Sequence, residues 1–269
     1  TKTLGVDGGT IKLDGNYPTG TNNVALGDAA LASGSLSGGD NTAIGFQALT
    51  TNTSGTVNTA VGGDALRYNT TGGNNASLGV NALKQNTSGS YNTGIGRSAL
   101  QSNTTAAANT AVGYQALTTN TTGGDSAAFG YQAAQSNTTG SYLTAIGRQA
   151  LYNNTTSSEN TAVGYQAMYN MSSTGDANKS TAVGYKAGYT STHNVDAFGS
   201  QALYSNTTGV LSVAMGREAL YSNTTGSYNT AIGYQAGFFI TSGAKNTILG
   251  RHNGNQGGLD IRTSSNNIV

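Results

Sequence analysis

Residues that could carry out catalysis are few in this chain and lie far apart along it. The two histidines, His193 and His252, have no cysteine and no carboxylate cluster at metal-ligand spacing near them. The 11 carboxylates occur mostly in turns, so no pair has the spacing of a general acid and a general base. The sequence therefore predicts a protein that is not an enzyme and that holds no metal or cofactor. We interpret both histidines as structural or solvent-exposed residues.

Aromatic residues recur at two fixed places and could bind sugars. In the first series, Arg97, Arg148, Arg217 and Arg251 interchange with Tyr114, Tyr131, Tyr165, Tyr185 and Tyr234. Such a column can pack between chains, or it can be an exposed stripe that stacks on sugar rings, and we favour packing because its period is that of the core. In the second series, which adjoins Asn-Thr-Thr turns, we expect exposed side chains and possible glycan contact: Tyr152, Tyr169, Tyr189, Tyr204 and Tyr221.

Asparagine recurs in the triplet Asn-Thr-Thr or Asn-Thr-Ser, which is also the acceptor sequence for N-glycosylation. Nine such asparagines are Asn52, Asn69, Asn86, Asn103, Asn120, Asn137, Asn154, Asn206 and Asn223. A ladder of side-chain amides that hydrogen-bond from one repeat to the next explains the same spacing without any sugar. We favour the ladder, with glycosylation as the alternative.

All these residues belong to one repeat, and its period decides the architecture. The unit reads NTAIGFQAL from Asn41, NTAVGYQAL from Asn109 and NTAVGYQAMY from Asn160. Its marker glycines are Gly27, Gly45, Gly62, Gly79, Gly96, Gly113, Gly130, Gly147, Gly164, Gly184, Gly199, Gly216, Gly233 and Gly250. Their spacing is constant from Gly45 to Gly164 and returns to the same value from Gly199 to Gly250. The interval before Gly184 is longer and the interval after it is shorter, so the array recovers its phase.

Each repeat carries large and small apolar residues at fixed places, which predict its core. Large apolar residues directly before the marker glycine are expected to form one internal stripe, including Ile44, Val61, Val112, Ile146, Val163 and Ile232. The fourth residue after the glycine is mostly leucine and supplies the second core position, as in Leu49, Leu117 and Leu220. Tight packing is expected at the glycines and at the alanines three residues after them: Gly45, Gly113, Gly164, Gly233, Ala48, Ala116, Ala167 and Ala219.

The content of Thr, Val, Ile, Tyr and Gly favours short strands and tight turns over helices. We expect two strands of about five residues and two turns in each unit, stacked at about 4.7 Å into a rod of about 65 Å. The fold class is therefore an all-β parallel β-solenoid of about fourteen coils. One chain of this kind has a thin core, and the alanine line is where we expect several chains to approach one another.

Composition excludes several classes of partner. Of 269 residues, 40 are glycine, none is cysteine or tryptophan, and 9% are charged. The net charge of +1 lacks the clustered basic residues that bind nucleic acid or an anionic membrane. No apolar run is long enough to predict membrane insertion. The chain starts without Met and stops in what looks like a strand, so we expect a piece of a longer protein.

Three regions are expected along the chain. Residues 1–20 form a strand and turn segment that joins a preceding fibre region. Residues 21–253 form the repeat array, and residues 254–269 form an exit segment that leads to a further C-terminal region. The stretch from Asp176 to Asp196, where the period is disturbed, is a place to look for binding specificity.

The repeat NTAVGYQAL followed by NTTG resembles the head repeats of trimeric autotransporter adhesins and, more closely, the arrays of bacteriophage tail fibre proteins. The stretch from Asn246 to Val269 resembles the segment that follows such arrays. The resemblance covers about Thr21 to Val269. It implies a left-handed parallel β-roll in each chain, three chains side by side, and a rigid shaft displayed outside a virion or a cell.

Taken together, these features favour a structural protein: a homotrimeric tail-fibre shaft that displays a receptor-binding tip for attachment to a host surface. The alternative is a bacterial adhesin head whose side binds host or matrix glycans. An ice-binding solenoid is a more distant alternative, because bulky tyrosines interrupt its threonine columns. The receptor could be a glycan or a protein, and the expected location is extracellular, on a virion or a cell surface.

Overall fold

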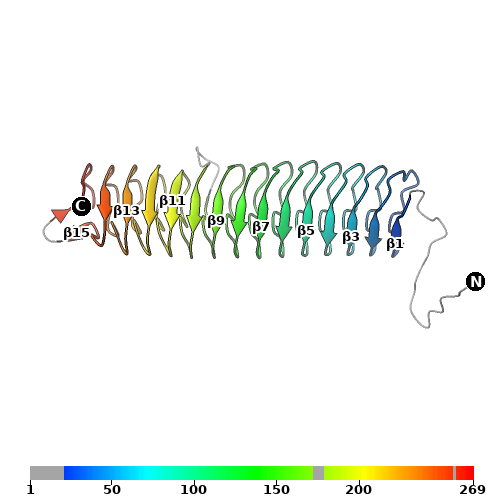
Figure 1. The fold of residues 1–269 in the computed structure, drawn as a ribbon, viewed down its shortest axis with the longest axis horizontal. Helices are drawn as coiled ribbons and strands as arrows, with labels where there is room; N and C mark the ends of the chain where they lie inside the picture. The colour runs from blue at the N-terminus through cyan, green and yellow to red at the C-terminus, as the bar shows by residue number, and fades with distance from the viewer. Residues whose placement is uncertain (1–20, 172–178, 257–258) are drawn as a thin grey trace, which may run out of the picture.

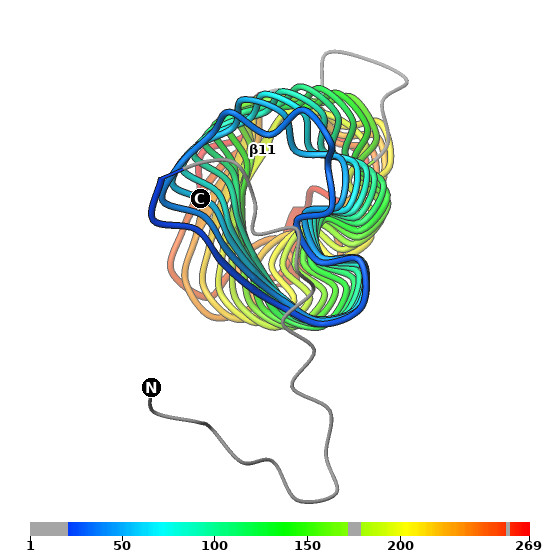
Figure 2. The same cartoon turned by 90° about the vertical axis from the view of Figure 1, so that its right-hand side faces the viewer.

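The chain forms one straight rod of stacked coils (Figure 1). The computed structural model describes residues 21–171, 179–256 and 259–269. The predicted segment 1–20 and Asp176 lie outside the described residues. A view along the rod shows the coils lying over one another around a common axis, each turned slightly relative to the last (Figure 2). The prediction of an all-β parallel β-solenoid, with one coil for each repeat of the sequence, is confirmed.

Fourteen strands form a single parallel sheet in sequence order along the rod. They are β1 (Val24–Leu26), β2 (Thr42–Ile44), β3 (Thr59–Val61), β4 (Ala76–Leu78), β5 (Thr93–Ile95), β6 (Thr110–Val112), β7 (Ala127–Phe129), β8 (Thr144–Ile146), β9 (Thr161–Val163), β10 (Thr181–Val183), β11 (Val195–Phe198), β12 (Ser212–Met215), β13 (Thr230–Ile232) and β14 (Thr247–Leu249). Two short strands, β15 (Asn255–Gln256) and β16 (Leu259–Asp260), pair antiparallel at the end.

Each described coil contains one strand, so the expectation of two strands per unit was wrong. The reason lies in the backbone after the marker glycine, which itself has φ between 106° and 141°. The second and fourth residues after it are left-handed, as in Gln47 at φ 55° and Leu49 at φ 51°. Left-handed residues cannot continue an extended strand. This side of the coil still hydrogen-bonds to its neighbour, for example from Leu49 N–H to Ala65 O at 3.0 Å.

The large residue before the marker glycine lies on the outside of the rod, so the predicted internal stripe was wrong there. Ile44, Ile146 and Ile232 are 37%, 41% and 38% exposed. Val61, Val112 and Val163 are half-buried. Successive side chains of a strand point to opposite faces. The middle residue, such as Ala43, points inward and is 0% exposed, which forces both of its neighbours outward.

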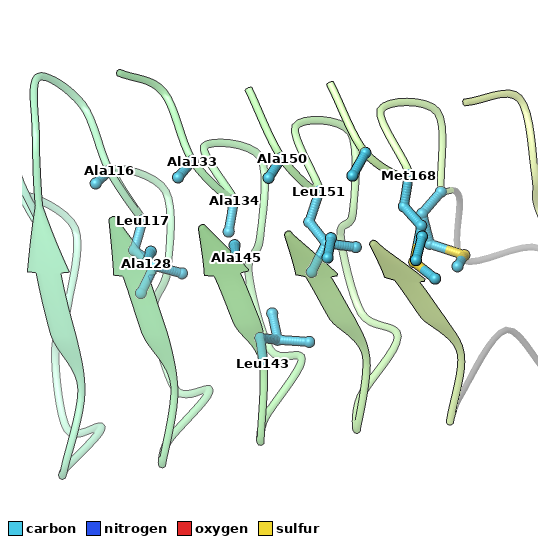
Figure 3. Packing of buried hydrophobic residues seen from close by; sticks show 14 of the residues in the cluster. Ala116, Leu117, Ala128, Ala133, Ala134, Leu143, Ala145, Ala150, Leu151 and Met168 are labelled. Carbon is cyan, nitrogen blue, oxygen red and sulfur yellow. The ribbon is translucent and has the colours of Figure 1, made fainter. Parts of the chain in front are cut away.

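The core consists of leucines and alanines from the two sides of each coil. Leu49, Leu117 and Leu220 are 0% exposed. So are Ala48, Ala116, Ala167 and Ala219. Figure 3 shows Ala116 and Leu117 among these buried side chains. The idea that other chains approach along the alanine line was therefore wrong. The space is small: a Cβ added to Gly94, at the middle of β5, would lie 3.2 Å from the Cγ of Leu83.

The marker glycines form a column at a corner of the coil, and the stacking itself requires glycine there. A Cβ added at Gly45 would lie 2.6 Å from the carbonyl oxygen of Gly62 in the next coil. The φ angles of Gly45, Gly113, Gly164 and Gly233, between 131° and 139°, add a conformational reason. The glycines thus let the chain turn and let neighbouring coils approach.

The uneven spacing around Gly184 leaves the sheet in register. Ala162 pairs with Ala182 across the longer interval, and Ala182 pairs with Ala197 across the shorter one. At the C-terminal end, residues 266–269 lie over the last coil: Leu249 N–H donates to Val269 O at 2.8 Å, and Val269 N–H donates to Thr247 O at 2.9 Å. These residues cover part of the open edge of β14.

Adjacent glycines provide a matched test of the stacking. We expect Gly62→Ala to destabilise the rod by at least about 1 to 3 kcal/mol, because it combines a strained φ with a Cβ 2.6 Å from the Gly79 oxygen. Gly63→Ala, where nothing lies within 4 Å of the added Cβ, is the control and should change stability little. Denaturant midpoints followed by circular dichroism measure both. Equal midpoints for the two variants would contradict this account of the glycine column.

Candidate functional site

The asparagines of the Asn-Thr-Thr and Asn-Thr-Ser turns point into the rod and bind one another. Asn103 Nδ2 donates to Asn86 Oδ1 in the preceding coil at 2.8 Å and to Ala106 O in its own turn at 3.0 Å. Asn120 repeats both bonds, at 3.1 Å and 2.9 Å. All nine asparagines are 0% exposed. The predicted amide ladder is confirmed, and we call it the first asparagine ladder.

A second asparagine ladder, which the sequence reasoning missed, is formed by the asparagine that begins each NTA motif. Asn58 N–H donates to Asn41 Oδ1 at 3.0 Å, and Asn58 Nδ2 donates to Gly72 O at 2.9 Å. Asn75, Asn92 and Asn109 continue the same pattern. The signal was present, because the motif begins with asparagine in most copies. These side chains tie the start of each strand to the turn across the coil.

The first ladder stops where another residue replaces asparagine. Met171 and Ile240, both 0% exposed, occupy its position in their coils. The oxygens that would have accepted from them, Oδ1 of Asn154 and Oδ1 of Asn223, are buried without a hydrogen-bond partner. A buried acceptor that lacks a partner costs free energy. Each break in the ladder therefore marks a weak point in the stack.

The second tyrosine series is a stacked column that lies partly inside the rod. Tyr152, Tyr169, Tyr189, Tyr204 and Tyr221 are half-buried, and the stack continues to Phe238. Neighbouring ring centroids are 5.0 to 5.3 Å apart, with planes within 2° to 14° of parallel. The expectation of exposed rings was wrong, because each interior ring uses both faces for its neighbours. Sugar rings therefore cannot stack on those faces.

The residues directly after the marker glycines are the more exposed ring column. Tyr131 and Tyr185 are 44% and 49% exposed. Tyr114 stacks on Tyr131 at 5.3 Å, and Tyr165 stacks on Tyr185 at 5.4 Å. The guanidinium of Arg148 lies between these two pairs, 5.3 Å from the Tyr131 ring and 6.0 Å from the Tyr165 ring. We call this series, with its arginines, the outer ring column.

Glutamines form a further ladder between the two ring columns. Gln132 donates to Gln115 at 3.2 Å, Gln149 to Gln132 at 3.0 Å, and Gln166 to Gln149 at 2.9 Å. At the same position in the next coil, the Lys186 ammonium is 5.6 Å from the Tyr185 ring and 5.0 Å from the Tyr189 ring. The glutamine position thus lies beside both ring columns.

Within the described part of the chain, the outer face of the sheet carries the largest set of exposed apolar side chains. We use the name outer apolar column for the residues directly before the marker glycines. Beside Ile44 and Ile146, it includes Leu78 at 50% and Met215 at 46% exposure. The threonine that begins a strand, such as Thr144 in β8, lies two residues before the outer apolar column and points to the same face of the sheet. On its other side the outer apolar column adjoins the outer ring column, separated only by the glycines.

Charged groups form small local pairs. Asp64 accepts from Arg67 at 3.3 Å and from Lys84 at 2.9 Å. The Gln235 side chain donates to Glu218 at 2.7 Å, which together with Arg217 holds the pKa of that carboxyl below its usual value. The Arg262 guanidinium similarly lowers the pKa of Asp260. These pairs are spread along the rod, and none joins two carboxylates.

Both histidines take part in local turn contacts. His193 Nδ1 lies 2.8 Å from Thr192 Oγ1, and Thr192 donates to the carbonyl of Thr207 in the next coil. His252 Nδ1 accepts from Gly254 N–H at 3.2 Å. These contacts agree with the structural interpretation of the two residues.

Removing one member of the first asparagine ladder should destabilise the rod. Asn103→Ala deletes the donor to Asn86 and the acceptor for Asn120. We expect a loss of about 1 to 3 kcal/mol for each buried group left without a partner. The neighbouring Ser102→Ala, at a half-buried position, is the control. Urea midpoints compare the two variants, and a loss for Asn103→Ala no larger than that for Ser102→Ala would contradict the ladder's contribution to stability.

The stacked ring column should make the rod sensitive to alkali. Burial, and then the neighbouring tyrosines Tyr152, Tyr189 and Tyr165, raise the pKa of Tyr169. Because the folded state holds this proton more tightly, the contribution is complete below the unfolded pKa of about 10 and is lost as pH rises through the folded pKa. We expect Tyr169→Phe to reduce the fall in unfolding midpoint between about pH 9 and about pH 11. Tyr228→Phe, at an exposed position, is the control, and an unchanged pH profile for Tyr169→Phe would contradict the prediction.

Within residues 21–171, 179–256 and 259–269, no group of three or more His, Cys, Asp or Glu side chains could hold a metal ion. No helix in that part of the chain is long and apolar enough to cross a membrane. A scan of protein-family models and a search of curated proteins find no match to this chain.

Proposed function

We propose that this chain is the shaft of an extracellular attachment fibre, in which three copies lie side by side and carry a receptor-binding tip. The observation that carries the proposal is the outer apolar column, which runs along the whole parallel sheet of a straight rod. A contiguous exposed apolar surface marks an interaction site. The rod gives the fibre its length, and the outer apolar column provides the face on which the copies assemble.

The axial repeat of the rod supports a second copy of the chain as the partner. Each coil presents its apolar side chain at one strand spacing, about 4.7 Å, from the next. A partner with a different axial repeat loses register with this column after a few coils. Another copy has the same repeat and can match the column along its full length. Cyclic assembly of copies is also the common arrangement of soluble oligomers.

The resemblance of the repeat to phage tail fibre arrays supports a left-handed β-roll, a homotrimer and a place on a virion surface. Under this proposal the host receptor, which is a glycan or a protein, binds the tip or the stretch around His193, where the period of the repeat is disturbed. The alternative, a bacterial adhesin head that binds glycans along its side, has less support at the stacked ring column, because the ring faces there are occupied.

Substitution in the outer apolar column should prevent assembly without unfolding the chain. We expect the parent chain to sediment as a trimer and Ile95→Lys combined with Ile146→Lys to sediment as a monomer, with an unchanged circular dichroism spectrum. Ile95 and Ile146 are 38% and 41% exposed, so lysine can reach solvent when the chain is alone. Thr71→Lys, at an exposed turn position away from the column, is the control and should stay trimeric. A monomeric parent chain would overturn the proposed assembly.

A further inference from the structure

The nine Asn-Thr-Thr and Asn-Thr-Ser triplets combine a modification signal with a buried acceptor. N-glycosylation places a bulky sugar on a surface asparagine. Here every one of the nine asparagines is 0% exposed and belongs to the first asparagine ladder. The hydroxyl residue two positions later in the triplet, such as Thr71 or Thr105, is exposed. The signal is therefore outside the rod while the nitrogen that would accept the sugar is inside.

Glycosyl transfer to these asparagines would remove a hydrogen bond of the ladder. In that reaction the side-chain Nδ2 forms a bond to the anomeric carbon of a lipid-pyrophosphate-linked oligosaccharide. The bond from that carbon to the pyrophosphate oxygen breaks, the lipid pyrophosphate leaves, and one Nδ2 proton passes to a base of the transferase. In Asn103 both N–H groups are in use, at 2.8 Å to Asn86 Oδ1 and 3.0 Å to Ala106 O. The glycosylated nitrogen keeps only one N–H group, so one of these two hydrogen bonds is lost.

The interior also has no room for a sugar beside the ladder. A single Cβ added to Gly89 would lie 2.5 Å from Asn86 Oδ1 and 3.0 Å from Asn103 Nδ2. Similar contacts surround the ladder at Gly72 and Gly209. A site that cannot accept one carbon atom cannot accept a sugar ring. Glycosylation at any ladder asparagine and closure of the coil around it therefore exclude one another.

We infer that the chain is made in a compartment that does not attach N-linked oligosaccharides, since transfer to the unfolded chain would prevent the coils from stacking. This inference concerns biosynthesis and is independent of the proposed fibre function. It also assigns the nine triplets as turn and ladder sequences that remain unmodified in the folded protein.

Two adjacent asparagines allow a sharp test. Asn154 belongs to the ladder and is 0% exposed. Asn153 lies one residue earlier, is half-buried, and its Nδ2 donates to Asn170 Oδ1 at 2.9 Å. The position of Asn153 is outward, since in other coils it holds residues as different as Gln85 and Phe239, both exposed. Thr155 completes the acceptor triplet of Asn153, and Thr156 completes that of Asn154.

The experiment starts from a chain without acceptor triplets, in which alanine replaces the hydroxyl residue of each one. The buried Ser77 can be replaced by alanine, because Ala60 and Ala43 occupy the same position in β3 and β2. For the triplet that ends at Ser180, Asn178→Gln is used instead, so that this buried serine is kept. Restoring Thr155 alone makes Asn153 the acceptor, and restoring Thr156 alone makes Asn154 the acceptor. All three chains are directed through a eukaryotic secretory pathway and, separately, made in the cytosol of the same cells. Glycan occupancy is measured by mass spectrometry, and folding by protease resistance and unfolding midpoint.

We expect all three cytosolic chains to be unmodified and protease-resistant. In the secretory pathway, the Asn153 chain should carry a glycan and stay protease-resistant, whereas the Asn154 chain should carry a glycan and lose its resistance. A glycosylated Asn154 chain with the midpoint of the Asn153 chain would overturn the inference. An unmodified and folded Asn154 chain from the secretory pathway would overturn it as well, because the coil would then close before transfer.

Discussion

The structure depends on one constraint: each coil hydrogen-bonds to the next at a single axial spacing. Because every position then lies over its counterpart, a residue must suit a neighbour of its own kind. Asparagine suits this arrangement, since its amide can donate to one coil and accept from the other, as Asn103 does between Asn86 and Asn120. Glycine suits it at the corner, where a Cβ on Gly45 would meet the Gly62 carbonyl at 2.6 Å. The repeat in the sequence is a direct result of this stacking.

The same constraint explains why the rod has a small core and an apolar exterior. The left-handed residues after the glycine bring Leu49 and Ala48 inward, and the strand adds only a small side chain, Ala43. A coil of this size cannot also enclose the large residue before the glycine, so Ile44 faces outward. The rod therefore has hydrogen-bonded asparagine ladders in its interior and exposed apolar side chains on its outer face. This combination is the physical basis for proposing a fibre shaft that assembles from identical chains.

Irregularities of the repeat differ in how well the stack tolerates them. The longer and the shorter interval around Gly184 leave β9, β10 and β11 in register. Replacement within a ladder is less well tolerated, since Met171 and Ile240 leave the oxygens of Asn154 and Asn223 without partners. The stack can thus vary in the length of a repeat more easily than in the identity of its ladder residues.

The sequence by itself determined the period, the parallel β-solenoid, the first asparagine ladder and the burial of Leu49, Leu117 and Leu220, because each is a direct consequence of like residues recurring at one spacing. Only the tertiary structure decided that the large residues before the marker glycines face outward. Ile44 and Leu49 are equally apolar, yet the alternation within β2 directs Ile44 outward, while a left-handed φ of 51° directs Leu49 inward. The two tyrosine series differ in the same way: Tyr169 is half-buried in a stack and Tyr185 is 49% exposed. Residue type cannot separate a core from a surface that another chain covers, since both favour apolar side chains. The backbone conformation of each coil makes that separation.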